Sequence, residues 1–327
     1  MKKTTYAAGI LEAYEYLLSN HKDFFIIGQG LWSPWYVGST MTDLDEKFGK
    51  ERVIDCPISE LATTGATVGA AICGYRPMIV HPRVDFMLLA VDQIVTQAAK
   101  WRHMFGGNSS APATFRAIIN RGGEQGAQHS QSLHSWFAHI PGLKVVMPYT
   151  AKDARDLMIS SVLCDDPVMF MDDRWLYEKE EKYTDIEIID LNKVGPQKLR
   201  DGNEVTVVGL SYTSLLCENS CQSIEKSHKI TTDFFDLRVL NPLNIDDILL
   251  SVKKTGRLLV VDGDWESCGM ASEIISCVLE KIDITLLKKS PKRITLPNSP
   301  APTSKVLEQQ YYIKEADIIN ALIEIVK

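Results

Sequence analysis

The 327-residue sequence lacks several patterns that would assign it to common functional classes. It contains no Cys-x-x-Cys pair, and its seven cysteines lie mostly in apolar stretches, which indicates reduced thiols and not a zinc or disulfide framework. Met1–Tyr6 lack the apolar core of a signal peptide, and no window of about 20 apolar residues is long enough to span a membrane. The net charge of -7 argues against binding to nucleic acid or to anionic membranes. We therefore expect a soluble, cytoplasmic protein.

A dinucleotide-binding fingerprint is also missing. Two α/β units would suit a nicotinamide-dependent oxidoreductase, but no Gly-x-Gly-x-x-Gly follows the first expected strand, which ends at Gly28. The absence disfavours that class of enzyme.

Short apolar runs alternate with amphipathic stretches, and this alternation predicts parallel sheets covered by helices on both faces. In the first half we expect strands over 23–28, 78–80, 113–120, 143–147 and 168–171, with helices over 4–20, 86–104 and 151–163. In the second half we expect strands over 204–210, 229–235, 257–262 and 284–287, with helices over 212–225, 245–253, 269–281 and 314–326. Between the halves, Asp172-Asp173-Arg174 and Glu178–Lys182 read as a solvated charge run at a domain boundary.

The clearest candidate for chemistry is a carboxylate at the start of an apolar helix. Glu60 precedes a stretch with no charge before Arg76, in which small residues recur at helical spacing. A carboxylate in such a place is desolvated unless it finds a partner. The alternative is that Ser59 caps the helix and Glu60 only complements the helix dipole.

A polar loop after the expected strand 113–120 contains Gln128-His129-Ser130-Gln131-Ser132. Ligands bind beyond the carboxyl ends of strands in doubly wound sheets, so His129 lies where a site is expected. A structural role for His129 stays open at this point, and we assign structural roles to His134 and His139. Their spacing does not match a zinc-binding pair on one helical face.

Several ungapped runs agree together with one family. The runs are Arg52–Glu60, Gly74–Pro77, Asp92–Ile94, Ala98–Lys100, Gln128–Ser132, His139–Val146, Asp236–Arg238 and Lys254–Val261. Together they resemble the β subunits of 2-oxo acid dehydrogenase E1 components, the group of the pyruvate and branched-chain enzymes, which is related to transketolase. The resemblance implies two three-layer αβα domains. A transketolase-like pyrimidine-binding domain would cover 1–185, a linker 186–200, and a transketolase C-terminal-like domain 201–327.

The resemblance also implies thiamine diphosphate as the cofactor. The family's essential glutamate falls on Glu60, which would hydrogen-bond N1′ of the aminopyrimidine. Its stacking aromatic falls on Phe86, which without the resemblance would read as a core residue, and Ile58 would line the same cofactor site. The active-site histidine falls on His129, which would contact the substrate or the acyl-carrying intermediate.

One absence points to a partner. The family of thiamine diphosphate enzymes holds the diphosphate through Mg²⁺ with a Gly-Asp-Gly motif and a later Asn, and this chain has no such pair. Val261-Asp262-Gly263-Asp264 resembles a fragment of the motif but follows a strand of the second half, so we interpret it as unrelated. The resemblance therefore implies an α subunit that carries the motif, in an α2β2 heterotetramer.

Departures from the family concern the substrate and a possible second metal. The residues that depart near the site are Gln29, His81 and Arg83. Gln29 stands where the family has an acidic residue, whereas His81 and Arg83 would suit an anionic group on the substrate. The family's potassium ion would be held by backbone near Ser161, Val162, Cys164 and Asp166. Cys164 occupies a usual Asp position, which places that ion in doubt.

Two functions with the same cofactor follow. The first is decarboxylation of a 2-oxo acid with acyl transfer to a lipoyl-bearing E2 protein. The alternative is a two-subunit ketol transferase or carboligase that uses a ketose donor and a sugar or aldehyde acceptor, which Gln29, His81 and Arg83 favour. A catalytically silent scaffold subunit is disfavoured, because Glu60, Phe86 and His129 are all present.

Overall fold

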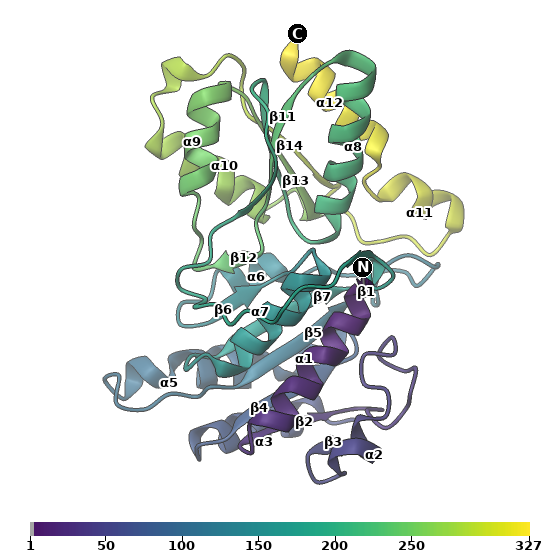
Figure 1. The fold of residues 1–327 in the computed structure, drawn as a ribbon, viewed down its shortest axis with the longest axis vertical. Coiled ribbons are helices and arrows are strands. Elements are labelled where there is room, and N and C mark those ends of the chain that lie inside the picture. The colour runs from purple at the N-terminus through teal and green to yellow at the C-terminus, as the bar shows by residue number, and fades with distance from the viewer. Residues whose placement is uncertain (1–2) are drawn as a thin grey trace. The chain divides into compact units, whose positions relative to one another are not determined.

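The structure is a computed structural model that describes residues 3–327 (Figure 1). The chain forms two compact units, each with its own sheet. The first comprises Met1–Arg121 and Trp136–Lys193, and the second comprises Gly122–Ser135 and Val194–Lys327. Among residues 3–327, every helix falls short of the length and apolarity that a membrane crossing requires.

The first unit contains six parallel strands in the spatial order β6-β7-β5-β4-β2-β3. They are β2 (Phe24–Gly28), β3 (Val53–Asp55), β4 (Arg76–His81), β5 (Thr114–Ile119), β6 (Lys144–Val146) and β7 (Val168–Asp173). The central strands β5 and β7 are buried along their whole length, as expected for strands covered on both faces. A separate antiparallel pair joins β1 (Lys3–Thr5) to β8 (Glu180–Lys182).

Two helical layers cover this sheet (Figure 1). Helix α1 (Tyr6–Asn20) packs with α7 (Ala151–Leu163) in one layer, and α3 (Glu60–Ile72) packs with the helical segment 84–104 in the other. The helix expected over 86–104 is confirmed as an uninterrupted helical segment over 84–104, although its helix type changes along its length. The segment consists of α4 (Val84–Met87), a 3-10 turn (Leu88–Ala90), a π-helical stretch (Gln93–Ala98) and α5 (Ala99–Met104). Apolar residues three to five apart fit all three helix types, so their spacing predicts a helix without showing where its type changes.

Three short helical elements complete the description of this part of the chain. They are α2 (Leu44–Phe48), α6 (His134–Ala138) and a 3-10 turn (Arg174–Leu176).

The second unit contains a five-stranded sheet in the order β14-β13-β10-β11-β9, in which only β9 is antiparallel. Its strands are β9 (Gln197–Arg200), β10 (Val205–Gly209), β11 (Thr232–Asp236), β13 (Leu258–Trp265) and β14 (Lys292–Leu296), and the short β12 (Val239–Asn241) lies between β11 and β13 in sequence. Its helices are α8 (Tyr212–His228), α9 (Asp246–Thr255), α10 (Met270–Lys281), α11 (Lys305–Tyr311) and α12 (Glu315–Val326). Helix α12 packs on α8, and their apolar faces form one core with β10 and β13.

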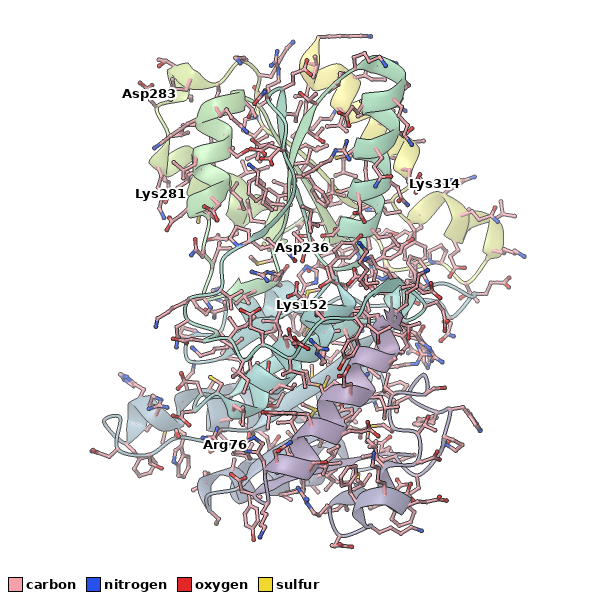
Figure 2. The ribbon with its side chains drawn as sticks, in the orientation of Figure 1. Arg76, Lys152, Asp236, Lys281, Asp283 and Lys314 are labelled. Atoms are coloured by element: carbon pink, nitrogen blue, oxygen red, sulfur yellow. The ribbon has the colours of Figure 1, made fainter. Side chains whose placement is uncertain are left out.

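The strand expected over 284–287 is wrong. Ile284–Leu286 form a 3-10 turn, which begins where the Asp283 side chain (Figure 2) accepts a hydrogen bond from the backbone of Thr285. Ile284 is 70% exposed, so this apolar run does not reach the core. The edge position of the sheet is taken by β14, whose Lys and Arg content hides it from a hydrophobic pattern.

The expectation of a solvated charge run at Asp172-Asp173-Arg174 is wrong for both aspartates, which end the buried strand β7. Arg116 on the neighbouring β5 forms a two-pronged ion pair with Asp172, at 3.0 and 2.7 Å. Arg121 lies just beyond β5 and pairs with Asp173 at 2.7 Å. The partners lie more than fifty residues apart in the sequence, so local composition does not reveal that the charges are neutralised inside the fold.

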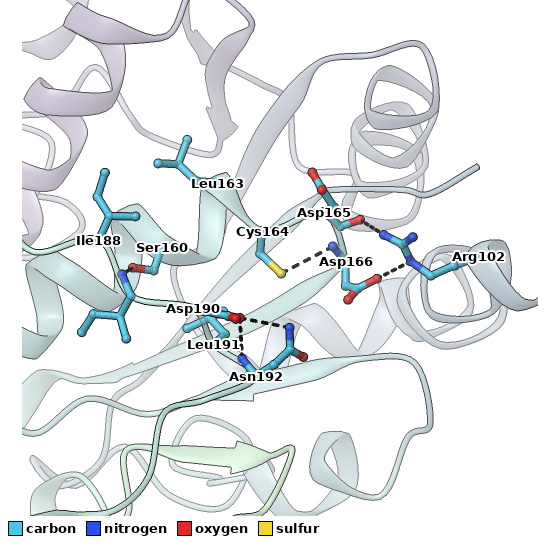
Figure 3. Close-up of a pocket in the computed structure, with 11 residues that line it drawn as sticks. Arg102, Ser160, Leu163, Cys164, Asp165, Asp166, Ile188, Asp190, Leu191 and Asn192 are labelled. Atoms are coloured by element: carbon cyan, nitrogen blue, oxygen red, sulfur yellow. Dashed lines mark hydrogen bonds and ion pairs between the residues drawn. The ribbon is translucent and has the colours of Figure 1, made fainter. Parts of the chain in front are cut away.

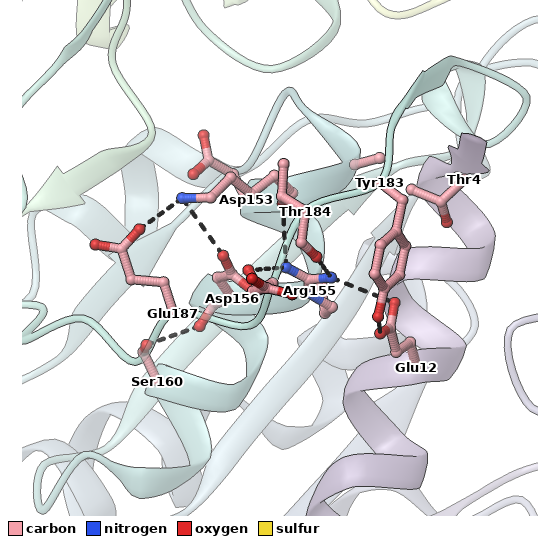
Figure 4. A network of polar contacts seen from close by, with 12 residues as sticks. Thr4, Glu12, Asp153, Arg155, Asp156, Ser160, Tyr183, Thr184 and Glu187 are labelled. Carbon is pink, nitrogen blue, oxygen red and sulfur yellow. Dashed lines mark hydrogen bonds and ion pairs between the residues drawn. The ribbon is translucent and has the colours of Figure 1, made fainter. Parts of the chain in front are cut away.

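Arg155 of α7 makes most of the hydrogen bonds that hold the polar segment after β8 on this helix (Figure 4). Arg155 donates to the backbone carbonyls of Thr184 and Asp185, each at 2.7 Å, and to the carboxylate of Asp156 at 2.8 Å. One turn further along α7, the Ser160 hydroxyl accepts the backbone N–H of Ile189 at 2.8 Å. The chain that leaves the first unit is therefore fixed to it by backbone hydrogen bonds.

Candidate active site

The strand ends of the first unit bring polar side chains to one edge of its sheet. Because the six strands are parallel, their carboxyl ends lie on the same edge, where ligands bind in sheets of this kind. Across the neighbouring strands β7, β5, β4, β2 and β3, the residues that follow the strand ends are Arg174, Arg121, Arg83, Gln29 and Glu60. The edge thus changes from cationic at one end to a carboxylate at the other.

Glu60 is the first residue of α3 and is buried, with only 6% of its surface exposed. The side-chain amide of Gln29 donates a hydrogen bond to its Oε1 at 3.0 Å. Within residues 3–327, Oε2 accepts no hydrogen bond. Ser59 occupies the N-cap position without a capping hydrogen bond, so helix capping does not account for this arrangement. The result is a buried carboxylate with one oxygen oriented and the other available to a ligand donor.

The backbone around Gln29 explains why its amide reaches Glu60. Asp55, the last residue of β3, accepts the N–H of Gly30 at 2.7 Å. Gly30 has a φ of +66°, a conformation that glycine adopts without strain. The Trp32 indole N–H donates to the carbonyl of Val53 at 2.8 Å, which fixes the next turn of the loop to the same strand.

Two apolar side chains predicted at the cofactor site lie in the same unit. Ile58 is 82% exposed in the turn that leads into α3. Phe86 is half-buried on the short helix α4, which follows β4. An exposed isoleucine beside a buried carboxylate is the type of surface that an aromatic ring of a ligand covers.

His81 ends β4 and is buried, with its Nε2 3.4 Å from the hydroxyl of Thr64 on α3. Burial lowers the pKa of His81 from 6.5 to about 3, so its imidazole is neutral at physiological pH. A neutral imidazole offers a hydrogen bond but no charge to an anionic group. Of the two residues predicted to bind such a group, Arg83 is the cationic one.

His129 lies in the second unit, on the segment Gly122–Ser135, and is half-buried. Both ends of this segment are anchored within that unit. Near the start, the Glu308 carboxylate accepts the N–H of Glu124 at 3.1 Å. Near the end, His134 Nε2 lies 2.9 Å from Asp262 Oδ1, and both side chains are fully buried.

Asp262 belongs to the fragment that resembles a metal-binding motif. Its carboxylate also accepts the backbone N–H groups of Asp264 and Ala271, each at 3.1 Å. Burial would raise the pKa of Asp262, but the charge of His134 and these hydrogen bonds hold it below its usual range. Both oxygens of the carboxylate are therefore engaged by the protein.

The region predicted to hold potassium is hydrogen-bonded to an arginine. Arg76 (Figure 2) donates to the carbonyl oxygens of Val162 and Cys164, at 3.2 and 3.0 Å. The Ser161 hydroxyl donates to a carbonyl of its own helix, and Asp166 pairs with Arg102 (Figure 3). A cavity of about 600 Å³ lies beside these residues, between the end of α7 and the segment 188–192. Within residues 3–327, no group of three or more Asp, Glu, His or Cys side chains is arranged to hold a metal ion.

Residues 2–179 match the transketolase pyrimidine binding domain, and residues 195–318 match the transketolase C-terminal domain. A split-gene transketolase, solved as an inactive β4 tetramer, shares the fold with a TM-score of 0.77 at 15% identity, over 98% of this chain and 96% of that chain. Together with the buried carboxylate at the strand edge, these matches define the class: transketolase-like enzymes of two α/β domains.

Relatives narrow the class to a family. The β subunit of acetoin:2,6-dichlorophenolindophenol oxidoreductase from Bacillus subtilis is 39% identical over 86% of this chain and 82% of its own length. The pyruvate dehydrogenase E1 component subunit β from Rickettsia bellii is 36% identical over 91% of both chains. The chain belongs to the family of β subunits of thiamine diphosphate-dependent 2-oxo acid dehydrogenase E1 components, as its sequence motifs predicted. Membership implies an α subunit as partner.

Sequence reasoning missed two residues at the site edge. Arg174 was assigned to a solvated charge run, and Thr64 was not singled out. A usable signal existed for Arg174, because it directly follows a buried strand, as Arg121 nearly does.

Proposed function

We propose that this chain is the β subunit of a two-subunit 2-oxo acid dehydrogenase that decarboxylates a 2-oxo acid and transfers the acyl group to a lipoyl acceptor. The observation that carries the proposal is Glu60, which is buried and held at one oxygen by Gln29, while its other oxygen has no donor among the residues that the structure describes. This geometry suits a carboxylate that shares a proton with a ring nitrogen inside a water-poor site.

Three residues of the first unit would contact the cofactor, each in a different way. Glu60 would hold the proton at N1′ of the aminopyrimidine, Phe86 would stack on that ring, and Ile58 would cover its apolar edge. When bound, thiamine diphosphate supplies the nucleophilic carbon that attacks the 2-oxo group. His129 of the second unit would hydrogen-bond the substrate or the departing acyl group.

The remaining parts of the site would come from other chains. An α subunit with Gly-Asp-Gly and a later Asn would bind Mg²⁺ and the diphosphate, and we propose an α2β2 assembly with a lipoyl-bearing E2 as acceptor. A potassium ion near Ser161–Asp166 has less support, because Arg76 already donates to the carbonyl oxygens there. All seven cysteines are free thiols, which fits a cytoplasmic location.

A second function, a ketol transferase or carboligase with the same cofactor, is favoured by two local departures from the family. Gln29 contacts Glu60 with an amide where a dehydrogenase β subunit would have an acid, and Arg83 stands beside the site. Neither difference removes a residue that we propose to contact the cofactor.

Copurification from the native cells would test the proposal. We expect a stoichiometric partner with Gly-Asp-Gly and a later Asn, and thiamine diphosphate bound to the pair with Mg²⁺. Reduction of lipoamide in the presence of a 2-oxo acid would support the dehydrogenase, whereas turnover only with aldehyde acceptors would support the transferase. A chain that purifies alone and binds no thiamine diphosphate would contradict both.

A further inference from the structure

The segment Gly122–Ser135 carries His129 and belongs to the second unit, although it lies within the first half of the sequence. Residues 122–133, all of which the structure describes, form neither helix nor strand. A segment without a regular hydrogen-bond ladder keeps its conformation through individual contacts and opens locally when these are lost. The contacts at its two ends therefore determine where His129 is held.

The first half of the segment is fixed on α11 and on the residues just before that helix. The Glu308 carboxylate is buried and accepts the N–H of Glu124 at 3.1 Å. Gly126 lies against Thr303, whose hydroxyl would be 2.5 Å from a Cβ added at this glycine. His129 in turn donates its N–H to the carbonyl of Gly126 at 3.4 Å. This end of the segment is thus held as far as His129 itself.

The second half of the segment ends in a buried cluster of four polar side chains, Ser132, His134, Asp262 and Asp264. His134 Nε2 lies 2.9 Å from Asp262 Oδ1 and 4.0 Å from Asp264 Oδ2. On the other side of the ring, His134 Nδ1 lies 3.0 Å from the Ser132 hydroxyl. Both ring nitrogens therefore have partners, which fix the position and the orientation of the imidazole.

The two carboxylates of this cluster have pKa shifts of opposite direction. Burial would raise the pKa of Asp262, but the charge of His134 and the hydrogen bonds to the carboxylate bring it below its usual range. Burial does raise the pKa of Asp264, a shift that His134 opposes and Asp262 reinforces. Asp262 is thus the counter-ion of His134. Loss of one partner of a buried ion pair leaves the other charge uncompensated, so each member of this pair depends on the other.

His129 lies three residues after Gly126 and five residues before His134. A displacement at either end of so short a stretch reaches the residues between the ends, because few soft backbone dihedral angles are available to absorb it. A misplacement of about 1 Å at a reacting group can lower a rate by about 100-fold. The contacts of His134 therefore bear on any chemistry in which His129 takes part.

We propose that His134 and Asp262 are positioning residues for His129: their buried ion pair sets the place at which the segment presents the imidazole of His129 to the substrate. The proposal rests on the proposed role of His129 and adds two residues that would act through it without touching the substrate. It also gives the fragment Asp262–Asp264, which resembles part of a metal-binding motif, a function other than metal binding.

Hydrogen–deuterium exchange of the full-length chain tests the anchor without cofactor, partner or turnover. In the wild type, we expect slow exchange of the hydrogen-bonded N–H groups of Glu124 and His129. Asp262→Asn removes the charge opposite His134 and keeps the size of the side chain, so the amides of residues 124–134 should exchange at least tenfold faster. Rapid exchange of the segment in the wild type would overturn the proposal, as would equal rates in Asp262→Asn.

Asp233→Asn is the matched control. Asp233 is also buried in the second unit and pairs with Lys254 at 2.7 Å and with Lys198 at 2.9 Å. It lies near the start of β11, whereas Asp262 lies in the carboxyl half of β13. This variant also loses a buried ion pair, but the segment should exchange as in the wild type. Equal acceleration by both variants would indicate general destabilisation and contradict the proposal.

A double-mutant cycle measures the effect on the reaction, in the complex reconstituted with the partner subunit. His134→Gln should lower kcat with a 2-oxo acid and lipoamide at least tenfold and leave the dissociation constant of thiamine diphosphate unchanged. In the His129→Ala background, the same substitution should cause no further loss, because His134 would act through His129.

The two measurements separate this inference from the proposed function. Losses that multiply in the double variant would show a purely structural role for His134 and contradict the positioning role alone. A wild-type complex without any cofactor-dependent turnover would contradict the proposed function alone, because the exchange of the segment is measured without the cofactor.

Discussion

The amide of Gln29 donates to the carboxylate of Glu60 across 3.0 Å, from the loop after β2 to the first residue of α3. A carboxamide orients a carboxylate without competing for its proton, because it has no acidic hydrogen in the physiological range. In the proposed mechanism, the proton on Glu60 would therefore be exchanged with a ligand and not with this neighbour.

Replacement of Glu60 by Gln should abolish cofactor-dependent turnover, with a loss of at least about 100-fold, because the side chain keeps its size and loses its proton-sharing oxygen. Turnover of the reconstituted complex and the thermal midpoint of the variant would be measured together. Glu178→Gln, an exposed acidic residue of the same unit, is the control and should behave as the wild type. Normal turnover in Glu60→Gln would remove Glu60 from the mechanism.

Replacement of Gln29 by Glu should move the acid limb of the pH–rate profile to higher pH by about one unit or more. The substitution places two carboxylates about 3 Å apart, and like charges at that distance share a proton instead of both ionising. Gln29→Ala removes the hydrogen bond without adding a charge, so its acid limb should stay in place while its rate falls. Superimposable profiles for Gln29→Glu and the wild type would show that the two side chains do not interact during turnover.

Replacement of Arg116 by Met should lower the free energy of unfolding by about 3–5 kcal/mol, because it leaves Asp172 buried without its counter-ion. Urea denaturation followed by circular dichroism would measure the change. Arg102→Gln breaks a more exposed ion pair and should cost less than about 1 kcal/mol. A similar small loss for Arg116→Met would mean that the Tyr14, Thr40 and Tyr177 hydroxyls compensate for the missing charge.

His81 should make the protein less stable in mild acid. Its folded pKa of about 3 lies below the ordinary value of 6.5, so the unfolded chain binds a proton first as the pH falls. The contribution is fully present above pH 6.5 and declines by about 1.4 kcal/mol per pH unit below it, which is about 2 kcal/mol by pH 5. His81→Gln should remove that part of the pH dependence in urea titrations between pH 7 and 5. His139→Gln, at an exposed histidine, should keep it, and an unchanged slope in His81→Gln would contradict the assignment.

The sequence predicted most of the first unit, because buried parallel strands such as β5 are mostly apolar and are followed by recognisable polar loops. It failed where tertiary contacts decide the outcome. The sequence around the aspartates at the end of β7 predicted solvated charges, because it does not show that Arg116 and Arg121 pair with them. The apolar run Ile284–Leu286 predicted a strand, because the sequence does not show that Ile284 is exposed.

In the candidate site, too, some features could be predicted from local sequence and others depend on tertiary contacts. Glu60 could be identified from its apolar helix, but its bond to Gln29 joins residues 31 apart in the chain, and no local pattern encodes that contact. The neutral state of His81 likewise depends on how deeply β4 is buried, which residue type alone does not give. The roles of Ile58, Phe86 and His129 stay predictions.

The segment Gly122–Ser135 has a consequence for how this gene can be divided. Its anchors, Asp262 and Glu308, are encoded far downstream, within the second unit. A gene fragment that ends near Lys193 would still encode His129. However, the Glu124 N–H and the His134 ring would lose Glu308 and Asp262, the carboxylates that anchor the segment. Each unit is therefore compact in space but is built from two separate stretches of the sequence. Recombination between relatives would have to exchange the segment together with the C-terminal half to keep the two units intact.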